Sequence, residues 1–180
     1  MTLRSSQTIP ISAALGSTSS STQGSRVDLG VTFFPQEGPN WCWAACAVMG
    51  AHFFRTSDRT QRVIAATSLG DCDRAAKATE ISRCWTEQGL HSTLVPREMT
   101  FGDVKFEIDS GRPVGVGWLW SGGGGHVVMA VGYEEDDAGN KWIFVHDPLH
   151  LSGSQRMAFS TLVTATGLGR WEASWYQLKT

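Results

Sequence analysis

A cysteine with a glutamine upstream is the feature of this sequence that most clearly indicates chemistry. In the run QEGPNWCWAAC, Gln36 lies six residues before Cys42. Asn40 is a candidate N-cap for a helix expected over residues 41–54, so Cys42 would lie in the first helical turn. A helix N-terminus favours the thiolate, which is the nucleophilic form of cysteine. Cys42 is therefore the expected nucleophile of an acyl-transfer reaction.

Such a reaction also needs hydrogen-bond donors for the oxyanion that develops on the attacked carbonyl. One expected donor is the backbone N–H of Cys42, because the first amides of a helix have no partner within it. The other is the side-chain amide of Gln36, which the turn EGPN can fold back over the helix end. Cys46 lies one turn further along the helix and is expected to be a core residue.

The base that activates the thiol should be one of five histidines. These are His52, His91, His126, His146 and His150. His126 is the strongest candidate, because it opens the apolar segment HVVMAVGY and follows four glycines that leave its imidazole accessible. His52 would lie about 15 Å from Cys42 along the helix axis. His91 is expected at the surface, and His150 is a weaker alternative in a loop.

A carboxylate should orient this imidazole by accepting a hydrogen bond from its second nitrogen. Asp147 is the candidate, at the end of the apolar segment KWIFVHDP. Strands expected over 126–133 and 141–148 would form a hairpin that pairs its own ends and brings His126 next to Asp147. By strand alternation, His146 should face the opposite side of the sheet.

The remaining patterns predict the α+β class, with an N-terminal helical subdomain and a C-terminal antiparallel sheet. The expected helices cover residues 41–54, 58–67, 75–88 and 100–111, and the expected strands cover 28–34, 113–120, 126–133, 141–148, 155–159 and 171–178. Ser57 or Asp58 should open the second helix, and Thr100 should cap the fourth. The reactive residues would meet in the cleft between the subdomains.

The 180 residues are expected to form one folded domain over 27–180, preceded by a disordered tail over 1–26. The tail is rich in serine and threonine and lacks the continuous apolar core of a Sec signal. The protein would therefore be secreted by a non-Sec route, into a host cell for example, or remain cytoplasmic. No apolar run approaches the roughly 18 residues needed to span a membrane.

Composition argues against several other partners and cofactors. The net charge of −2 gives no general attraction to nucleic acid or to an anionic membrane. No CxxC pair with a matching histidine or cysteine pair is present, so neither a metal nor a cofactor is expected. Cys72 and Cys84 could form a disulfide if the protein is exported. Trp43 and Trp120 are candidates for substrate contact, although a core role fits Trp120 as well.

Three motifs in this order resemble the papain-like cysteine proteases: Gln-x5-Cys-Trp-Ala, Gly-His before an apolar strand, and Asp-Pro. Within that clan, NWCWAAC, GGHVVMAVGY and VHDP are most similar to the bacterial avirulence-effector proteases that plant pathogens deliver through type III secretion. The bacteriocin-leader peptidases are a second relative, with a different pattern after the cysteine. The resemblance covers about residues 33–148.

The resemblance implies a papain-like fold and a role for each matching residue. Cys42 would be the nucleophile, His126 the base and acid, Asp147 the orienting group and Gln36 the oxyanion donor. Papain itself has asparagine at the position of Asp147. The effector family is associated with self-cleavage at a Val-Pro-x-Phe-Gly-x-Trp-like site, which this sequence lacks.

The expected function is that of a cysteine endopeptidase, which cleaves protein or peptide substrates through an acyl-enzyme. Glutamine deamidase or transglutaminase chemistry would use the same residues and is one alternative. A papain-like binding module without activity is the other, although all four site positions are filled. A host protein that activates the enzyme is a further candidate partner, and the chain is expected to be monomeric.

Overall fold

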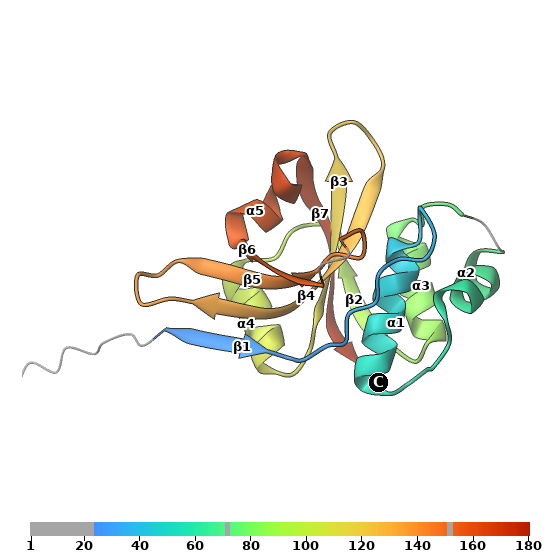
Figure 1. The fold of residues 1–180 in the computed structure, drawn as a ribbon, viewed down its shortest axis with the longest axis horizontal. Coiled ribbons are helices and arrows are strands. Elements are labelled where there is room, and N and C mark those ends of the chain that lie inside the picture. Colours follow the sequence, from blue (N-terminus) through green and yellow to red (C-terminus); the bar gives the residue numbers. More distant parts are fainter. Residues whose placement is uncertain (1–23, 71–72, 151–152) are drawn as a thin grey trace, which may run out of the picture.

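The chain passes from a helical first half into an antiparallel sheet, so the expected α+β class is confirmed (Figure 1). The computed structural model describes residues 24–70, 73–150 and 153–180. The helices are α1 (Cys42–Phe54), α2 (Gln61–Leu69), α3 (Ala78–Glu87), α4 (Phe101–Asp109) and α5 (Phe159–Val163), followed by the short 3-10 helix η1 (Ala165–Gly167). The strands are β1 (Ser25–Asp28), β2 (His91–Val95), β3 (Val114–Trp120), β4 (Gly125–Glu135), β5 (Lys141–His146), β6 (Ser154–Ala158) and β7 (Gly169–Lys179).

Strand β4 lies at the centre of the sheet and carries His126 near its start. The strands follow the order β2-β7-β3-β4-β5-β6, with every pairing antiparallel, and β1 pairs with the far end of β4. Trp118 of β3 lies opposite His126, whereas His146 of β5 lies opposite Met129. At the start of β4, His126 therefore pairs with β3, whereas the pairing of β4 with β5 begins only at Met129, three residues further along β4.

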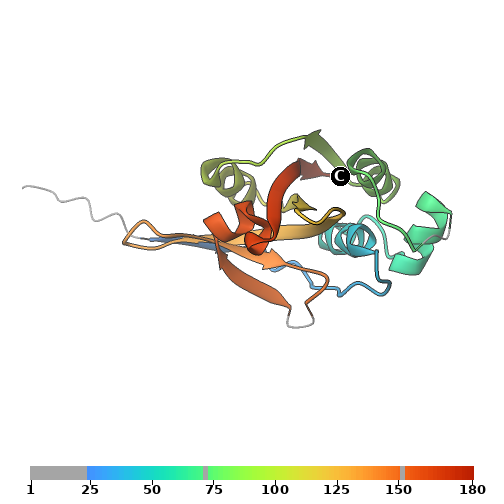
Figure 2. The same cartoon turned by 90° about the horizontal axis from the view of Figure 1, so that it is seen from above.

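Alternate side chains of β4 enter two different cores, which explains the continuous apolar segment HVVMAVGY. Val127, Met129 and Val131 pack with residues of α1, α2 and α3. Val128 and Ala130 pack with residues of α4 and α5. Strands that are buried on both faces have unbroken apolar sequences. Figure 2 shows α4 over the β-rich half of the molecule, apart from the group formed by α1 to α3.

The strand expected over 28–34 is wrong in its position. β1 covers Ser25–Asp28 and pairs with residues 132–135 of β4. Gly30 takes the chain out of the strand, because its φ of 66° is left-handed and its N–H donates to Asp28 Oδ1 at 2.9 Å. The first two residues of β1 fall within the expected tail, and residues 1–23 lie outside the described part of the chain.

The predicted cap of α4 is confirmed, whereas the predicted start of α2 is wrong. Thr100 Oγ1 accepts the N–H of Asp103, and the Asp103 carboxylate accepts the N–H of Thr100, each at 3.1 Å. α2 begins at Gln61 rather than near residue 58, because Thr60 supplies the side chain that accepts the N–H of Val63. A threonine two residues downstream therefore replaces the expected cap.

The strand β2 and the helix α5 are short elements that the sequence pattern does not predict. β2 forms an edge of the sheet with its side chains partly or fully exposed, and its partner β7 is the last strand of the chain. α5 has five residues and follows β6 without a break. Elements this short carry too few residues for a clear hydrophobic period, so packing decides their conformation.

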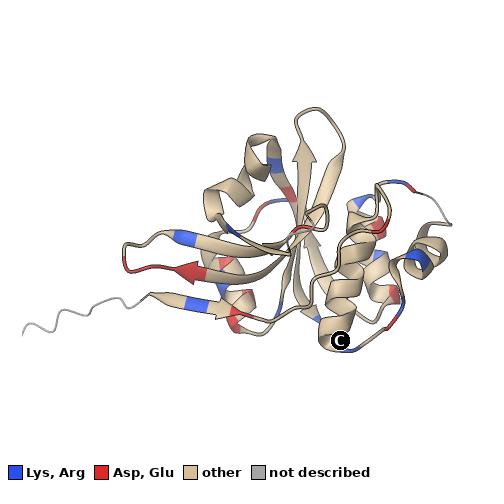
Figure 3. Cartoon of the chain, in the orientation of Figure 1, with Lys and Arg blue, Asp and Glu red and all other residues tan. Residues whose placement is uncertain are grey.

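Charged side chains lie on both halves of the molecule. Figure 3 shows acidic residues gathered at the turn between β4 and β5, with Lys and Arg spread over the helices and the sheet. In the part of the chain that the structure describes, no helix has the length and hydropathy that crossing a membrane requires.

Candidate active site

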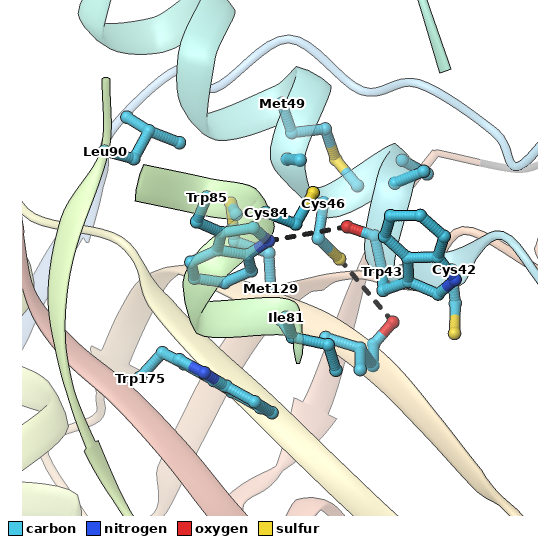
Figure 4. Close-up of a cluster of buried hydrophobic side chains, with 14 of the residues drawn as sticks. Cys42, Trp43, Cys46, Met49, Ile81, Cys84, Trp85, Leu90, Met129 and Trp175 are labelled. Atoms are coloured by element: carbon cyan, nitrogen blue, oxygen red, sulfur yellow. Dashed lines mark hydrogen bonds between the residues drawn. The ribbon is translucent and has the colours of Figure 1, made fainter. Parts of the chain in front are cut away.

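Cys42 is the first residue of α1 and lies at the margin of the helical core (Figure 4). It is 8% exposed and lines a cavity of about 160 Å³ between the helices α1 and α3 and the strands β3, β4 and β7. His126 lines the same cavity. The two subdomains therefore bring the expected nucleophile and the expected base to one cavity at their junction.

The start of α1 differs from the expectation in its cap. The side chain of Asn40 donates to Asp73 O at 3.1 Å, and its backbone N–H donates to Asp73 Oδ1 at 3.0 Å. Trp41 occupies the N-cap position, and no side chain among the described residues caps this helix. The first-turn amides, including that of Cys42, therefore keep donors that a ligand can use. The prediction that Asn40 caps α1 is wrong.

The imidazole of His126 is hydrogen bonded to Asp147. His126 Nε2 lies 2.6 Å from Asp147 Oδ1, and both side chains are buried. The expected hairpin register is wrong, because the β5 ladder begins only at Met129 and is shifted by a bulge after Ala130. Asp147 instead reaches His126 from beyond the end of β5. There the N–H of Leu149 donates to the same carboxylate oxygen at 3.0 Å.

The two polar partners of His126 determine its charge. Burial alone would lower its pKa, but hydrogen bonds and negative charge from Asp147 and Cys42 raise the pKa to about 9. With Nε2 bonded to Asp147, Nδ1 is the nitrogen left for the thiol of Cys42. The imidazole is therefore cationic at neutral pH, and a neighbouring imidazolium stabilises a thiolate. Burial would raise the pKa of Asp147, but its bond to His126 lowers it.

Gln36 lies in a turn that its own side chain closes. Nε2 donates to Gly38 O at 2.9 Å and to Pro39 O at 2.8 Å, while Oε1 is buried without a partner in the described residues. The backbone N–H of Gln36 donates to Pro148 O at 3.0 Å, which joins this turn to the loop that follows Asp147. To donate to an oxyanion, the amide would exchange one carbonyl partner for the substrate.

Gln61 holds the backbone around Gln36, a contact that sequence reasoning missed. It is 2% exposed at the start of α2. Its Nε2 donates to Pro35 O at 2.7 Å, and its Oε1 accepts the N–H of Glu37 at 3.0 Å. No motif marks this residue. The only available signal is a polar side chain at a position of α2 that faces the protein.

The two tryptophans expected to contact substrate occupy different places. Trp43 lines the cavity beside Cys42, and its Nε1 donates to Arg74 O at 3.3 Å. Trp120, at the end of β3, is not among the described residues that line the cavity. Its ring stacks on the imidazole of His126 instead, with the centroids 6.0 Å apart and the planes 16° apart.

Two other cysteines are free, buried thiols. Cys46 donates to Val127 O at 3.6 Å (Figure 4), and burial raises its pKa well above the usual value. Burial also raises the pKa of Cys84 to about 12. The expected core position of Cys46 is confirmed. Cys72, which could form a disulfide with Cys84 if the protein is exported, lies outside the described residues.

The other histidines are buried or exposed as the sequence suggests, and one of them, His150, makes a contact that was not expected. His146 is buried edge-on against Phe33, and burial lowers its pKa. His52 and His91 are exposed. His150 is exposed as well, but its Nε2 lies 3.6 Å from Asp147 Oδ2, a contact that the sequence did not indicate.

Comparison with known proteins identifies the family. The model of the family described as papain-like cysteine protease AvrRpt2 matches residues 24–165. The chain belongs to the AvrRpt2 family of papain-like cysteine proteases. It is a cysteine peptidase, as the cysteine, histidine and aspartate motifs of the sequence predict. None of the curated proteins is a significant match in sequence.

Solved structures at low identity share the fold of this AvrRpt2-family chain. A double glycine motif protease from an AMS/PCAT transporter, in complex with a leader peptide, matches with a TM-score of 0.60 and 15% identity over 86% of this chain and 95% of that chain. A putative C39-like peptidase from Bacillus anthracis gives 0.60 and 12% over 87% and 99%. The bromelain protease from Ananas comosus, in complex with E64, gives 0.57 and 16% over 86% and 99%. The expected papain-like fold is confirmed.

Replacing Asp147 with asparagine should lower the pKa of His126. The carboxylate is a main cause of the raised value of about 9, and loss of one adjacent charge shifts a pKa by about one to three units. NMR titration of the imidazole should show an inflection near pH 9 in the parent protein and a lower one in Asp147→Asn. Glu98→Gln, which removes an exposed carboxylate, should leave the inflection unchanged. An equal inflection in Asp147→Asn would contradict this electrostatic account.

Proposed function

We propose that this protein is a cysteine endopeptidase in which Cys42, His126 and Asp147 act as a catalytic triad. The observation that carries the proposal is the buried 2.6 Å bond between His126 and Asp147, on a cavity that Cys42 also lines. The uncapped start of α1 supports it, because the amide of Cys42 is left as a donor. Membership of the AvrRpt2 family supports the same chemistry.

In the first step, the Cys42 thiolate attacks the scissile carbonyl carbon and forms a carbon–sulfur bond. The carbonyl oxygen becomes an oxyanion, which the backbone N–H of Cys42 and the side-chain amide of Gln36 stabilise by hydrogen bonding. The tetrahedral intermediate then breaks its carbon–nitrogen bond. The His126 imidazolium gives the proton on Nδ1 to the leaving amine, which leaves an acyl-enzyme on Cys42.

In the second step, neutral His126 takes a proton from a water molecule whose oxygen attacks the thioester. The carbon–sulfur bond breaks, the peptide leaves as a carboxylic acid, and the imidazolium–thiolate pair is restored. Asp147 holds the ring through Nε2 in both steps, so Nδ1 stays directed towards the reacting atoms. Each proton that His126 gives is returned by water, so the cycle needs no other reactant.

The cavity beside Cys42 supports a polypeptide substrate with an apolar side chain near the scissile bond. Its wall is mostly apolar and includes Trp43, Ala78, Ile81 and Trp175. Glu172 is a charged residue in the lining, and Arg170 neutralises it through an ion pair of 2.6 Å. Burial of an apolar group in such a space stabilises a complex in proportion to the area removed from water.

We further propose that the protein is an effector that acts on proteins inside a host cell. The match to the AvrRpt2 family supports this role. Because an endopeptidase cleaves polypeptides, the proposed substrate in the host is a protein. A secretion route other than Sec fits the serine- and threonine-rich N-terminal sequence.

Replacement of Cys42 by alanine should abolish cleavage without unfolding the protein, because only the sulfur is lost at the first turn of α1. Wild-type protein and Cys42→Ala would each be incubated with extracts of a candidate host, and new N-termini would be identified by mass spectrometry. Termini that appear only with the wild type are the expected result. A fully active Cys42→Ala protein would rule out the proposal. Deamidated host proteins without new termini would favour the deamidase alternative, and cleavage of synthetic peptides alone would argue against the host-directed role.

Replacement of Gln36 by alanine tests the second oxyanion donor. Loss of one such donor lowers kcat by about 10²- to 10³-fold, with little change in KM. Alkylation of Cys42 by iodoacetamide forms no oxyanion, so its rate should be unchanged in Gln36→Ala. Equal losses in cleavage and alkylation would instead indicate that Gln36 only holds the turn at Gly38 and Pro39.

Enlarging a side chain in the cavity wall should change specificity. Ala78→Leu places three extra carbons in the cavity and should raise KM about tenfold or more for peptides with a large apolar side chain at the preferred position. Peptides with alanine there should be affected less. Thr79→Leu is the matched control, because Thr79 is the next residue of α3, is exposed and does not line the cavity. An equal effect of both variants on both peptides would argue against this subsite.

A further inference from the structure

The imidazole of His126 lies against two indole rings as well as its polar partners. Trp118 and Trp120 of β3 each have their ring centroid 6.0 Å from that of His126, and their own centroids are 5.6 Å apart. The two residues are separated by one position along β3, so they share a face of the strand. Trp120 is nearly parallel to the imidazole at 16°, whereas Trp118 is tilted by 44°.

The two indoles have different surroundings. Trp118 is 3% exposed, and its Nε1 donates to Leu162 O at 2.9 Å, which gives it a place in the core with α5. Trp120 is half-buried and does not line the cavity beside Cys42. The proposed mechanism therefore leaves the ring of Trp120 without a function, although that ring lies nearly parallel to the imidazole of the proposed base.

The turn between β3 and β4 holds the backbone of Trp120 in place. Its N–H donates to Gly124 O at 3.1 Å, and its carbonyl accepts the N–H of Gly123 at 3.0 Å. Gly125 permits the close approach of the two strands, because a Cβ there would lie 2.9 Å from Trp118 O. The glycine-rich turn therefore brings Trp120 and His126 together from adjacent strands.

We infer that Trp120 is a positioning residue for catalysis: its ring holds the plane of the His126 imidazole and stabilises the protonated form. Offset stacking is favourable at this separation. The face of an indole also attracts a cation within about 6 Å of the ring centroid. The inference rests on the proposed role of His126, and it assigns Trp120 to the catalytic base rather than to the substrate.

Other charged or titratable groups lie on the elements around His126. They are Cys42 and Cys46 of α1, Asp147 and His150 after β5, and Glu172 with its partner Arg170 on β7. Cys42 and Asp147 act on the imidazole directly, whereas His150 acts through Asp147. All of these groups remain when Trp120 is replaced. A change in the titration of His126 in a Trp120 variant therefore measures the effect of the Trp120 ring on the imidazole.

The test measures how the alkylation of Cys42 by iodoacetamide depends on pH. The rate should rise again near pH 9, where His126 loses its proton. In Trp120→Leu this inflection should move to lower pH by about one unit, the size expected for loss of a partly buried cation–π contact. Trp120→Phe keeps an aromatic face and should shift less. Cleavage of a peptide should show a lower kcat with little change in KM.

Trp142→Leu is the matched control, and its inflection should not change. Trp142 is half-buried and stacks on Arg156 at 3.8 Å. It lies opposite Glu134, which is eight residues along β4 from His126. An unchanged inflection with a raised KM in Trp120→Leu would overturn the inference and assign Trp120 to substrate binding.

The inference stays testable if Trp120→Leu does not fold, or if the protein cleaves no peptide. If Trp120→Leu does not fold, phenylalanine and pentafluorophenylalanine would be compared at position 120, because fluorination weakens the attraction of a ring face for cations. Equal inflections in that pair would overturn the inference. Alkylation needs no peptide substrate, so a shifted inflection in a protein that cleaves nothing would contradict the proposed function, and with it a catalytic role for Trp120, while leaving the stabilisation of the imidazolium by its ring in place.

Discussion

The hydrogen bond between His126 and Asp147 is the interaction on which the rest of the site depends. Burial by itself favours a neutral imidazole, but the buried carboxylate 2.6 Å away, together with Cys42, raises the pKa of His126 to about 9. That carboxylate in turn keeps its charge because the imidazolium offsets its own burial. Each residue therefore favours the charged form of the other. The architecture must therefore deliver both to one point.

The fold achieves this by joining the two subdomains through the loop that follows β5. Asp147 reaches back to His126 at the start of β4, and the next residue, Pro148, accepts the N–H of Gln36 from the segment that leads into α1. Gln61 of α2 holds the backbone on both sides of Gln36. The proposed base, its orienting carboxylate and the proposed oxyanion donor are thus connected by short backbone links rather than by independent packing.

Much of the site could be predicted because its chemistry limits the residue types that can perform it. Cys42 at a helix start, His126 at the start of a buried strand and Asp147 at a strand end carry local signals that do not depend on distant partners. The expected positions of α1, α3 and α4 and of β3, β4 and β5 agree with the structure to within a few residues for the same reason. Their hydrophobic patterns are long enough to distinguish helix from strand.

The errors concern features that depend on partners far apart in the sequence. Asn40 is a residue type that often caps helices, yet both its side chain and its backbone N–H donate to Asp73. The hairpin expected to pair its own ends is shifted by a bulge, so Asp147 meets His126 by a different path. Gln61 and β2 match no motif or clear hydrophobic period, because only their tertiary contacts give them a role.

The sequence by itself therefore determined the type of chemistry, the α+β class and the candidates for nucleophile, base and orienting group, because these follow from residue type and local periodicity. Only the tertiary structure decided how those residues meet, what surrounds the imidazole and which groups hold the loop around Gln36. Those features depend on hydrogen bonds and ring contacts between separate elements. Contacts of this kind form only when the strands and helices pack together, so they cannot be read from any one segment of the sequence.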